Sequence, residues 1–85
     1  MRLDKYLKIS RLIKRRTVAK EVADNNLILI NDLMAKPSST VKVGDILIIT
    51  LGNKIREIKV TSLTQGEEMF IVLKEEMRSY HDKLN

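Results

Sequence analysis

The feature that most constrains this chain is a change of hydrophobic period after residue 26. Before that point, apolar residues recur at helical spacing, as with Leu3 and Leu7 and with the apolar face over residues 18–23. After it, short apolar runs and polar alternation are typical of strands. The pattern predicts an α+β domain, in which two N-terminal helices pack on a small, mostly antiparallel sheet of four to five strands.

Two helices are expected in the N-terminal part of the chain, at residues 2–9 and near residues 16–25, joined by a bridge over residues 10–16. Thr17 is a candidate cap of the second helix, because a threonine hydroxyl can accept a bond from a free backbone N–H at a helix start. Asn25 and Asn26 favour the end of this helix, because asparagine tolerates the left-handed conformation found there.

The β pattern predicts extended segments at residues 27–30, 34–41, 46–51, 54–63 and 69–73. Turns are expected between them at residues 31–32, 44–45 and 52–53. Tyrosine and phenylalanine together supply three residues and tryptophan none, so the core must be aliphatic. The residues expected in the core are Leu3, Leu7, Val18, Val22, Ile28 and Ile30.

The chain of 85 residues is expected to form one domain over residues 1–75, followed by a polar tail over residues 76–85. A domain this small buries a little over about 60% of its unfolded surface, which leaves little room for a deep catalytic cleft. With no cysteine and a single histidine, His81, thiolate chemistry is excluded and no metal site is expected. No paired carboxylates or nucleophile–base pair stand in a recognisable motif, so we expect neither catalysis nor a cofactor.

Three features that the sequence lacks indicate the cellular compartment in which the protein works. No apolar run approaches the roughly 18 residues that a membrane-spanning helix needs, and no signal-peptide core follows the N-terminus. The absence of cysteine is consistent with a reducing compartment. We therefore expect the protein to work in the cytoplasm.

The positive charge of the chain is concentrated at its N-terminus. Residues 1–20 hold eight basic residues and one acid, a net charge of +7, whereas residues 21–85 carry a net charge of −2. A solvated helix face usually mixes charge signs, so an anionic partner that relieves the repulsion is favoured over a merely solvated face. Nucleic acid leads among anions, because arginine forks suit phosphates and base edges. The candidate binding residues are Arg2, Lys5, Lys8, Arg11, Lys14, Arg15, Arg16 and Lys20.

Four short motifs follow one another over residues 1–50. They are Arg2-Leu3-Asp4-Lys5-Tyr6-Leu7, Arg16-Thr17-Val18-Ala19, Ile30-Asn31-Asp32 and Gly44-Asp45-Ile46. In this order they resemble the S4-type RNA-binding domain, or alpha-L motif, whose pattern is R-L-D-x-x-L, R-x-x-A, V-N-G and G-D. Asn26 and Asp32 stand where the family usually has glycine, and both can adopt a positive φ, so the same fold is expected.

The whole chain is most similar to stand-alone S4 proteins of ribosome-associated quality control, with a small heat-shock protein as a relative. This likeness is carried by residues 12–24 and 73–76. It implies a non-enzymatic factor that binds the obstructed large ribosomal subunit at 23S rRNA and the peptidyl-site tRNA. It also implies a fibronectin-binding-like partner that recruits alanyl-tRNA, so that the stalled chain receives an untemplated alanine tail. The protein itself is expected to be a monomer.

Roles for single residues follow from the resemblance for Arg2 and Arg16, and from the chemistry of the residues themselves for Asp4 and Tyr6. Arg2 and Arg16 fall on family positions tied to RNA binding, and the other six basic residues are expected to contribute phosphate contacts. Asp4 is expected to orient Arg2, Lys8 or Arg16, although an acid in the first turn of a helix is equally favoured by the helix dipole. Tyr6 is expected to be half-buried core in preference to a ring that stacks on a base.

Three alternatives stay open at this point. The chain could be a heat-shock-type factor that recycles large subunits carrying peptidyl-tRNA. It could be a small DNA-binding regulatory module, although its second helix is short for reading a major groove. It could also be an interaction domain whose sheet binds protein, in which case binding would not weaken with salt.

Overall fold

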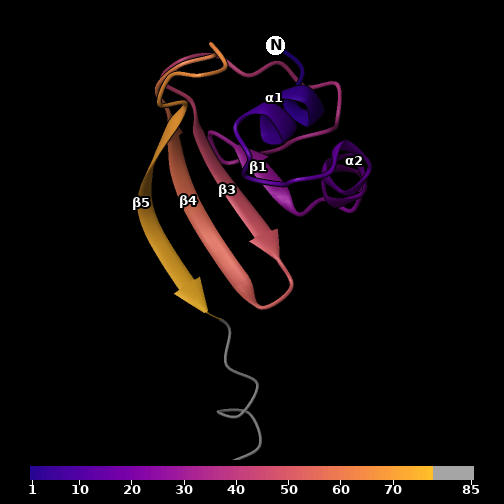
Figure 1. Ribbon diagram of the computed structural model, residues 1–85. Helices are drawn as coiled ribbons and strands as arrows, with labels where there is room; N and C mark the ends of the chain where they lie inside the picture. Colours follow the sequence, from indigo (N-terminus) through magenta and orange to yellow (C-terminus); the bar gives the residue numbers. More distant parts are fainter. Residues whose placement is uncertain (78–85) are drawn as a thin grey trace, which may run out of the picture.

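The computed structural model describes residues 1–77 as two helices followed by a five-stranded sheet (Figure 1). The elements are α1 (Leu3–Ile9), α2 (Arg16–Asp24), β1 (Ile28–Ile30), β2 (Leu33–Met34), β3 (Ile46–Leu51), β4 (Lys54–Val60) and β5 (Phe70–Met77). The sheet has the order β2-β1-β3-β4-β5, and every neighbouring pair is antiparallel. The helices lie together beside β1 and β3, while the far ends of β3, β4 and β5 extend beyond them. The predicted α+β architecture is confirmed.

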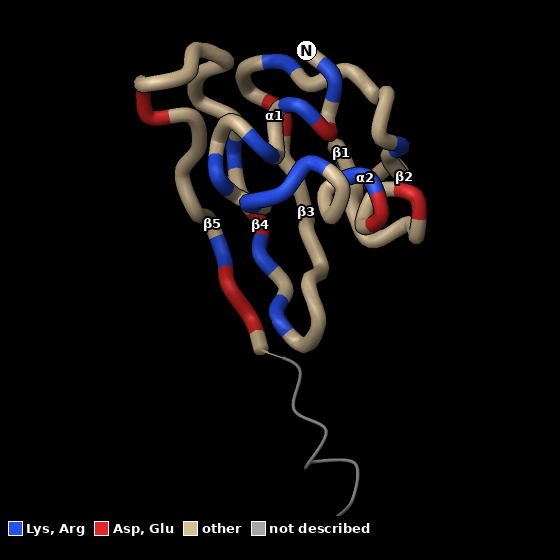
Figure 2. The backbone as a smooth tube through the Cα atoms, turned by 45° about the vertical axis from the view of Figure 1, so that its right-hand side comes forward, with Lys and Arg blue, Asp and Glu red and all other residues tan. Residues whose placement is uncertain are grey.

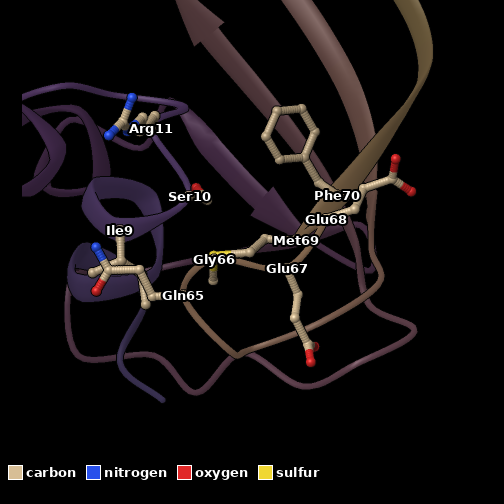
Figure 3. Close-up of a pocket in the computed structure, with 9 residues that line it drawn as sticks. All are labelled: Ile9, Ser10, Arg11, Gln65, Gly66, Glu67, Glu68, Met69 and Phe70. Atoms are coloured by element: carbon tan, nitrogen blue, oxygen red, sulfur yellow. The ribbon is translucent and has the colours of Figure 1, made fainter.

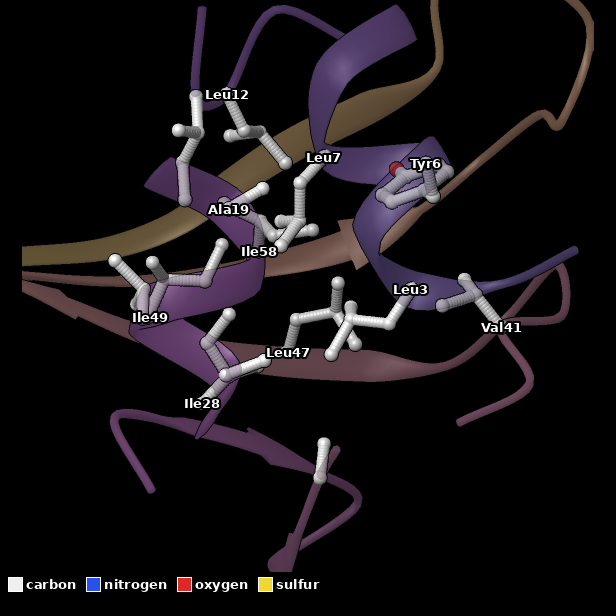
Figure 4. Packing of buried hydrophobic residues seen from close by; sticks show 14 of the residues in the cluster. Leu3, Tyr6, Leu7, Leu12, Ala19, Ile28, Val41, Leu47, Ile49 and Ile58 are labelled. Carbon is white, nitrogen blue, oxygen red and sulfur yellow. The ribbon is translucent and has the colours of Figure 1, made fainter. Parts of the chain in front are cut away.

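The core forms where the helices pack on the sheet, and Figure 4 shows side chains of α1 and α2 meeting those of β1, β3 and β4. In β3 and β4 the buried residues alternate with more exposed ones, as the strand period of two requires. Leu3, Leu7, Val22 and Ile28 are buried as predicted, and Ile30 is half-buried. Neither described helix, of seven and nine residues, could cross a membrane.

The prediction that Val18 lies in the core is wrong, because this side chain is 36% exposed. The buried face of α2 is made by Ala19, Val22 and Ala23, which share one side at helical spacing. The two alanines are fully buried, and α2 can lie close to α1 where their side chains are small. Because α2 is oriented about its axis so that the two alanines point inward, Val18 lies at the edge of the interface between α1 and α2.

The start of α2 also differs from the prediction. Its N-cap is Arg15, which makes no side-chain capping bond, and the Ala19 N–H donates to the Arg15 carbonyl at 3.0 Å. Thr17 lies inside the first turn, so it cannot serve as the cap. The end of the helix is confirmed, because Asn25 is the C-cap and Asn26 follows with a φ of 60°.

The segment predicted to be extended over residues 34–41 contributes only its first residue to a strand, since β2 spans Leu33–Met34. Beyond β2 the chain crosses the start of α1 and binds backbone groups there. The Leu3 N–H donates to the Ser39 carbonyl at 2.7 Å, and the Asp4 N–H donates to the Pro37 carbonyl at 3.1 Å. These bonds satisfy N–H groups that a helix start leaves free, so Pro37 and Ser39 cap α1. Of the segment beyond β2, Ala35 still bonds to the sheet, because its N–H donates to the Ile28 carbonyl at 2.9 Å.

The last strand is longer than predicted. β4 ends at Val60 instead of residue 63, and β5 runs from Phe70 to Met77, four residues beyond the predicted end. The register with β4 shifts between Glu57 and Ile58, and beyond this shift the extension pairs with β4 as far as Lys54, which faces Met77. Residues 76 and 77 of the predicted tail therefore belong to β5, and the rest of that tail, including His81, lies outside the described residues.

The motif residues Asn31, Asp32 and Asp45 form the turn between β1 and β2 and its contact with β3. Asn31 and Asp32 have φ angles of 50° and 69°, as a two-residue hairpin turn requires. The Asn31 side chain accepts from the Ile46 N–H at 2.9 Å and donates to Asp45 Oδ1 at 3.1 Å. Asn31 and Asp45 thus tie the β1–β2 turn to the start of β3.

Candidate nucleic-acid interface

The eight basic residues predicted to bind nucleic acid are all exposed, and Figure 2 shows them along α1, the connecting loop and α2. We call this set, Arg2, Lys5, Lys8, Arg11, Lys14, Arg15, Arg16 and Lys20, the basic surface. Within it the structure brings together two groups. One joins Arg2 and Arg16 through Asp4, and the other places Lys8, Arg11 and Lys14 around a shallow hollow. Within residues 1–77, the side chains of Lys5, Arg15 and Lys20 form no hydrogen bond or ion pair with either group, and Lys5 contacts Asp4 only through its backbone N–H.

The loop between the helices is held in place by two buried side chains, those of Leu12 and Ile13. The Ile13 N–H donates to the Leu7 carbonyl at 3.1 Å, which fixes the loop to the last turn of α1. Because these apolar residues occupy the core, the flanking Arg11 and Lys14 remain exposed. The sequence predicts only a bridge over residues 10–16, and the signal for this anchor is the apolar pair inside a basic run.

Arg11 has an unusual backbone conformation. Its φ is 66°, in the left-handed region, where a side chain other than that of glycine costs about 1–2 kcal/mol. The Arg11 N–H donates to the Lys8 carbonyl at 3.1 Å, so the residue closes the end of α1. In this position Arg11 lines a hollow together with Lys8 and Lys14, which we call the basic hollow.

Asp4 links the starts of both helices, although it is only 3% exposed. Its Oδ1 accepts from Arg2 Nε at 3.1 Å and from the Lys5 N–H at 2.8 Å, and its Oδ2 accepts from Arg2 Nη2 at 3.3 Å. Arg16 Nη2 lies 3.7 Å from Oδ1. Of the three neighbours that Asp4 was expected to orient, the structure thus brings Arg2 and Arg16 to it. Asp4 also stands in the first turn of α1, so both interpretations of this acid describe its position.

The charge of Asp4 is set by opposing effects. Burial acts to raise the pKa of this carboxyl, but the hydrogen bonds from Arg2 and from the Lys5 backbone, with the charges of Arg2 and Arg16, outweigh burial and hold the pKa below its usual range. The Arg2 and Arg16 side chains are 54% and 56% exposed. Each guanidinium therefore has one side on a carboxylate that is ionised at neutral pH and another side open to solvent, where a phosphate can bind.

Tyr6 belongs to the core and is not available for stacking. It is completely buried, more deeply than predicted, and its hydroxyl donates to the Met69 carbonyl at 2.7 Å. This burial raises the pKa of Tyr6 to about 12. The bond joins α1 to the residue before β5, so Tyr6 positions the connection between β4 and β5.

Comparison with known proteins identifies the family. The model of the S4 domain matches residues 1–47. The chain is 55% identical over 82 residues to the RQC P-site tRNA stabilizing factor of Listeria innocua, a match that covers 89% of each chain. It is 38% identical over 64 residues to a heat shock protein 15 homolog of Haemophilus influenzae, covering 75% of this chain and 49% of that protein.

A solved structure shares the fold. The trimeric structure of heat shock protein 15 from Vibrio cholerae superposes with a TM-score of 0.77, at 23% identity, over 85% of this chain and 80% of that chain. The Asp4-centred arginines, the Asn31–Asp45 turn contact, both helices and the first two strands lie within the segment that the S4 model matches. The chain belongs to the S4 domain family.

Proposed function

We propose that this chain is a non-enzymatic RNA-binding factor of ribosome-associated quality control that binds the large ribosomal subunit. The S4 match and the name of the 55% identical relative support a ribosome-associated RNA-binding role. The observation that carries the proposal is the pair of half-exposed arginines from two helix starts, Arg2 and Arg16, held on one buried carboxylate. In this arrangement two planar cations are already ordered before a phosphate arrives.

The finer part of the proposal concerns the RNA that is bound. The factor contacts 23S rRNA and the peptidyl-site tRNA of an obstructed large subunit, as the relative's name suggests for the tRNA. Beside a fibronectin-binding-like factor that recruits alanyl-tRNA, it supports addition of an untemplated alanine tail. The two groups of the basic surface lie at opposite ends of the short helix α1, so one rigid domain can contact two phosphates at once. We place this activity in the cytoplasm and assign it to a monomer.

The runner-up is a heat-shock-type factor that recycles large subunits carrying peptidyl-tRNA. The identity of 38% to a heat shock protein 15 homolog supports this candidate, but the match covers only 49% of that protein. The match to the quality-control relative, in contrast, covers 89% of it. We therefore favour the quality-control role, and an alanine-tailing assay with purified partner separates the two.

The test is sedimentation of the protein with purified large subunits, either empty or carrying peptidyl-tRNA, at two salt concentrations. Wild type is expected to bind in a salt-sensitive manner and to prefer the subunit that carries peptidyl-tRNA. Arg2→Ala and Arg16→Ala are each expected to weaken binding and to lower the salt dependence by about one released ion. The matched control is Lys59→Ala, which removes one positive charge from an exposed position between the buried residues Ile58 and Val60.

The outcomes separate the candidate functions. Equal binding by the arginine variants and wild type, with circular dichroism showing that all are folded, would remove the basic surface from the interface. Binding that ignores salt would favour a protein partner, and capture by duplex DNA in preference to subunits would favour the regulatory module. Subunit binding without stimulation of alanine tailing would favour the recycling role.

A further inference from the structure

A second hollow, of about 510 Å³, lies between the end of α1 and the connection from β4 to β5 (Figure 3). Its walls come from two distant parts of the sequence, residues 9–11 and 65–70. Arg11 lines this hollow and also the basic hollow that it shares with Lys8 and Lys14. The two hollows are therefore adjacent, with Arg11 as the wall between them. This volume is within the range of about 300–1,000 Å³ that is usual for small-molecule sites.

The chemistry of the second hollow differs from that of the basic hollow. Phe70, a half-buried aromatic residue, lines it, and Tyr6, the other aromatic among residues 1–77, is fully buried. Glu67 and Glu68 also line it, and Figure 3 shows their carboxylates pointing outward, away from Arg11 and from the other lining residues. Two carboxylates near its mouth disfavour a phosphate inside, whereas a flat, uncharged ring is compatible with the phenyl ring of Phe70.

The wall that carries Phe70 is fixed from the core. The Met69 carbonyl accepts from the buried Tyr6 hydroxyl at 2.7 Å and from the Thr61 N–H at 2.9 Å. Glu67 is also restrained, because its Oε1 accepts from the Ser62 hydroxyl at 2.6 Å. The hollow is thus bounded by residues that are already ordered, which lowers the entropy lost when a ligand binds.

The backbone of Arg11 supplies an independent argument. The φ of Arg11 is 66°, a conformation that glycine adopts at a lower conformational cost than arginine. Arg11 forms no salt bridge within residues 1–77, so its charge contributes no ion pair to the fold. A strained residue with an unpaired charge at the border of two hollows indicates a role in binding.

We propose that the second hollow binds one unpaired nucleobase of the RNA, with Phe70 stacking on the base and Arg11 binding the phosphate of the same nucleotide. This inference rests on the proposed function and deepens it, because it assigns the domain a contact with a single-stranded or looped nucleotide in addition to backbone phosphates. The nucleotide can come from rRNA or from tRNA, since the same base and phosphate chemistry occurs in both.

The test compares fluorescein-labelled hexaribonucleotides of adenosine, cytidine or uridine with an abasic hexamer that carries the same number of phosphates. Fluorescence anisotropy at low salt measures the affinity of each. Wild type is expected to bind at least one base-bearing hexamer about tenfold more tightly than the abasic one, the effect of one stacked base. Phe70→Leu is expected to abolish this difference and to keep the affinity for the abasic hexamer. Ile71→Leu, on the neighbouring residue, is the matched control and should behave as wild type.

The Arg11→Gly variant separates binding from folding. It is expected to weaken binding of both kinds of hexamer, while its thermal midpoint stays equal to that of wild type or rises. To distinguish the source, dimethyl sulfate probing of large subunits carrying peptidyl-tRNA compares wild type with Phe70→Leu. A base protected only by wild type then lies either in rRNA or in tRNA.

The results bear differently on the two proposals. Equal affinity of wild type for base-bearing and abasic hexamers, or unchanged discrimination in Phe70→Leu, overturns the base site and leaves RNA binding in place. Failure of wild type to bind any hexamer or any subunit overturns both the base site and the proposed function.

Discussion

Replacing Asp4 by asparagine separates positioning from bulk electrostatics, because the two predict opposite signs. The change keeps the shape of the side chain and raises the net charge of the chain from +5 to +6. If the basic surface acted only through its total charge, RNA should bind more tightly to the variant. If Asp4 holds Arg2 and Arg16 in place, RNA should bind less tightly, because both side chains would then have to be ordered on binding.

The structure sets the size of each effect. Ordering a long side chain on binding costs about 0.5–1.5 kcal/mol, so freeing two arginines should weaken binding by about 1–3 kcal/mol. Removing one negative charge about 8 Å from a phosphate in water is worth about 0.5 kcal/mol in the other direction, and less with salt. Positioning therefore outweighs the change in total charge, and the net loss of about 0.5–2.5 kcal/mol predicts that the affinity of Asp4→Asn falls about two- to sixtyfold.

The loss of stability should be small enough to leave the protein folded. The amide oxygen of asparagine can still accept from the Lys5 N–H, now at 2.8 Å from Asp4 Oδ1. The arginine bonds are charge-assisted, but their guanidiniums are about half exposed, so the loss is discounted to about 1 kcal/mol. Chemical denaturation should detect this loss while circular dichroism shows an intact fold.

The assay is equilibrium binding to large subunits that carry peptidyl-tRNA, with Asp24→Asn as the matched control. Asp24 is an exposed acid at the end of α2, so its variant makes the same charge change away from the Asp4 contacts. We expect Asp24→Asn to bind as wild type or slightly more tightly. The positioning argument is refuted if folded Asp4→Asn binds at least as tightly as Asp24→Asn.

Three further predictions test the fold and its ionisation. The lowered pKa of Asp4 means that its stabilisation is present above about pH 4 and is lost as pH falls through the lowered value, so the difference in unfolding free energy between wild type and Asp4→Asn should close below pH 4. The raised pKa of Tyr6, about 12, means that its contribution is present below about pH 10 and is lost as pH rises toward 12, and Tyr6→Phe should flatten this alkaline loss in denaturation titrations. Ala23→Leu should lower the unfolding free energy by about 1–3 kcal/mol in chemical denaturation, because Ala23 is fully buried and the larger side chain overfills the core beside α2. Val18→Ala should change the unfolding free energy by less than about 0.5 kcal/mol, because Val18 is exposed.

Much of the architecture could be read from local patterns. The helical spacing of Leu3 and Leu7 and the alternation in β3 and β4 depend on neighbours along the chain, so the sequence reports them directly. The same holds for Asn26 and Asp32, which tolerate positive φ where the family usually has glycine. The concentration of basic residues at the N-terminus also required no structure.

Other features depend on contacts between distant residues, which have no local signal. Residues 35–41 read as extended, but two of their carbonyls cap α1 because the free N–H groups of Leu3 and Asp4 lie within reach. Val18 and Ala19 both fit an apolar helix face, and the rotation of α2 against α1 decided which of them is buried.

The site shows the same division. By itself the sequence determined which residues are basic and that one acid, Asp4, stands among them. Only the tertiary structure decided that this acid holds arginines from two helix starts and that Arg11 meets Phe70, 59 positions further along the chain, at one hollow. The reason is physical, because charge and hydrophobic period are properties of short segments, whereas pairings between segments are set by the packing of the whole core.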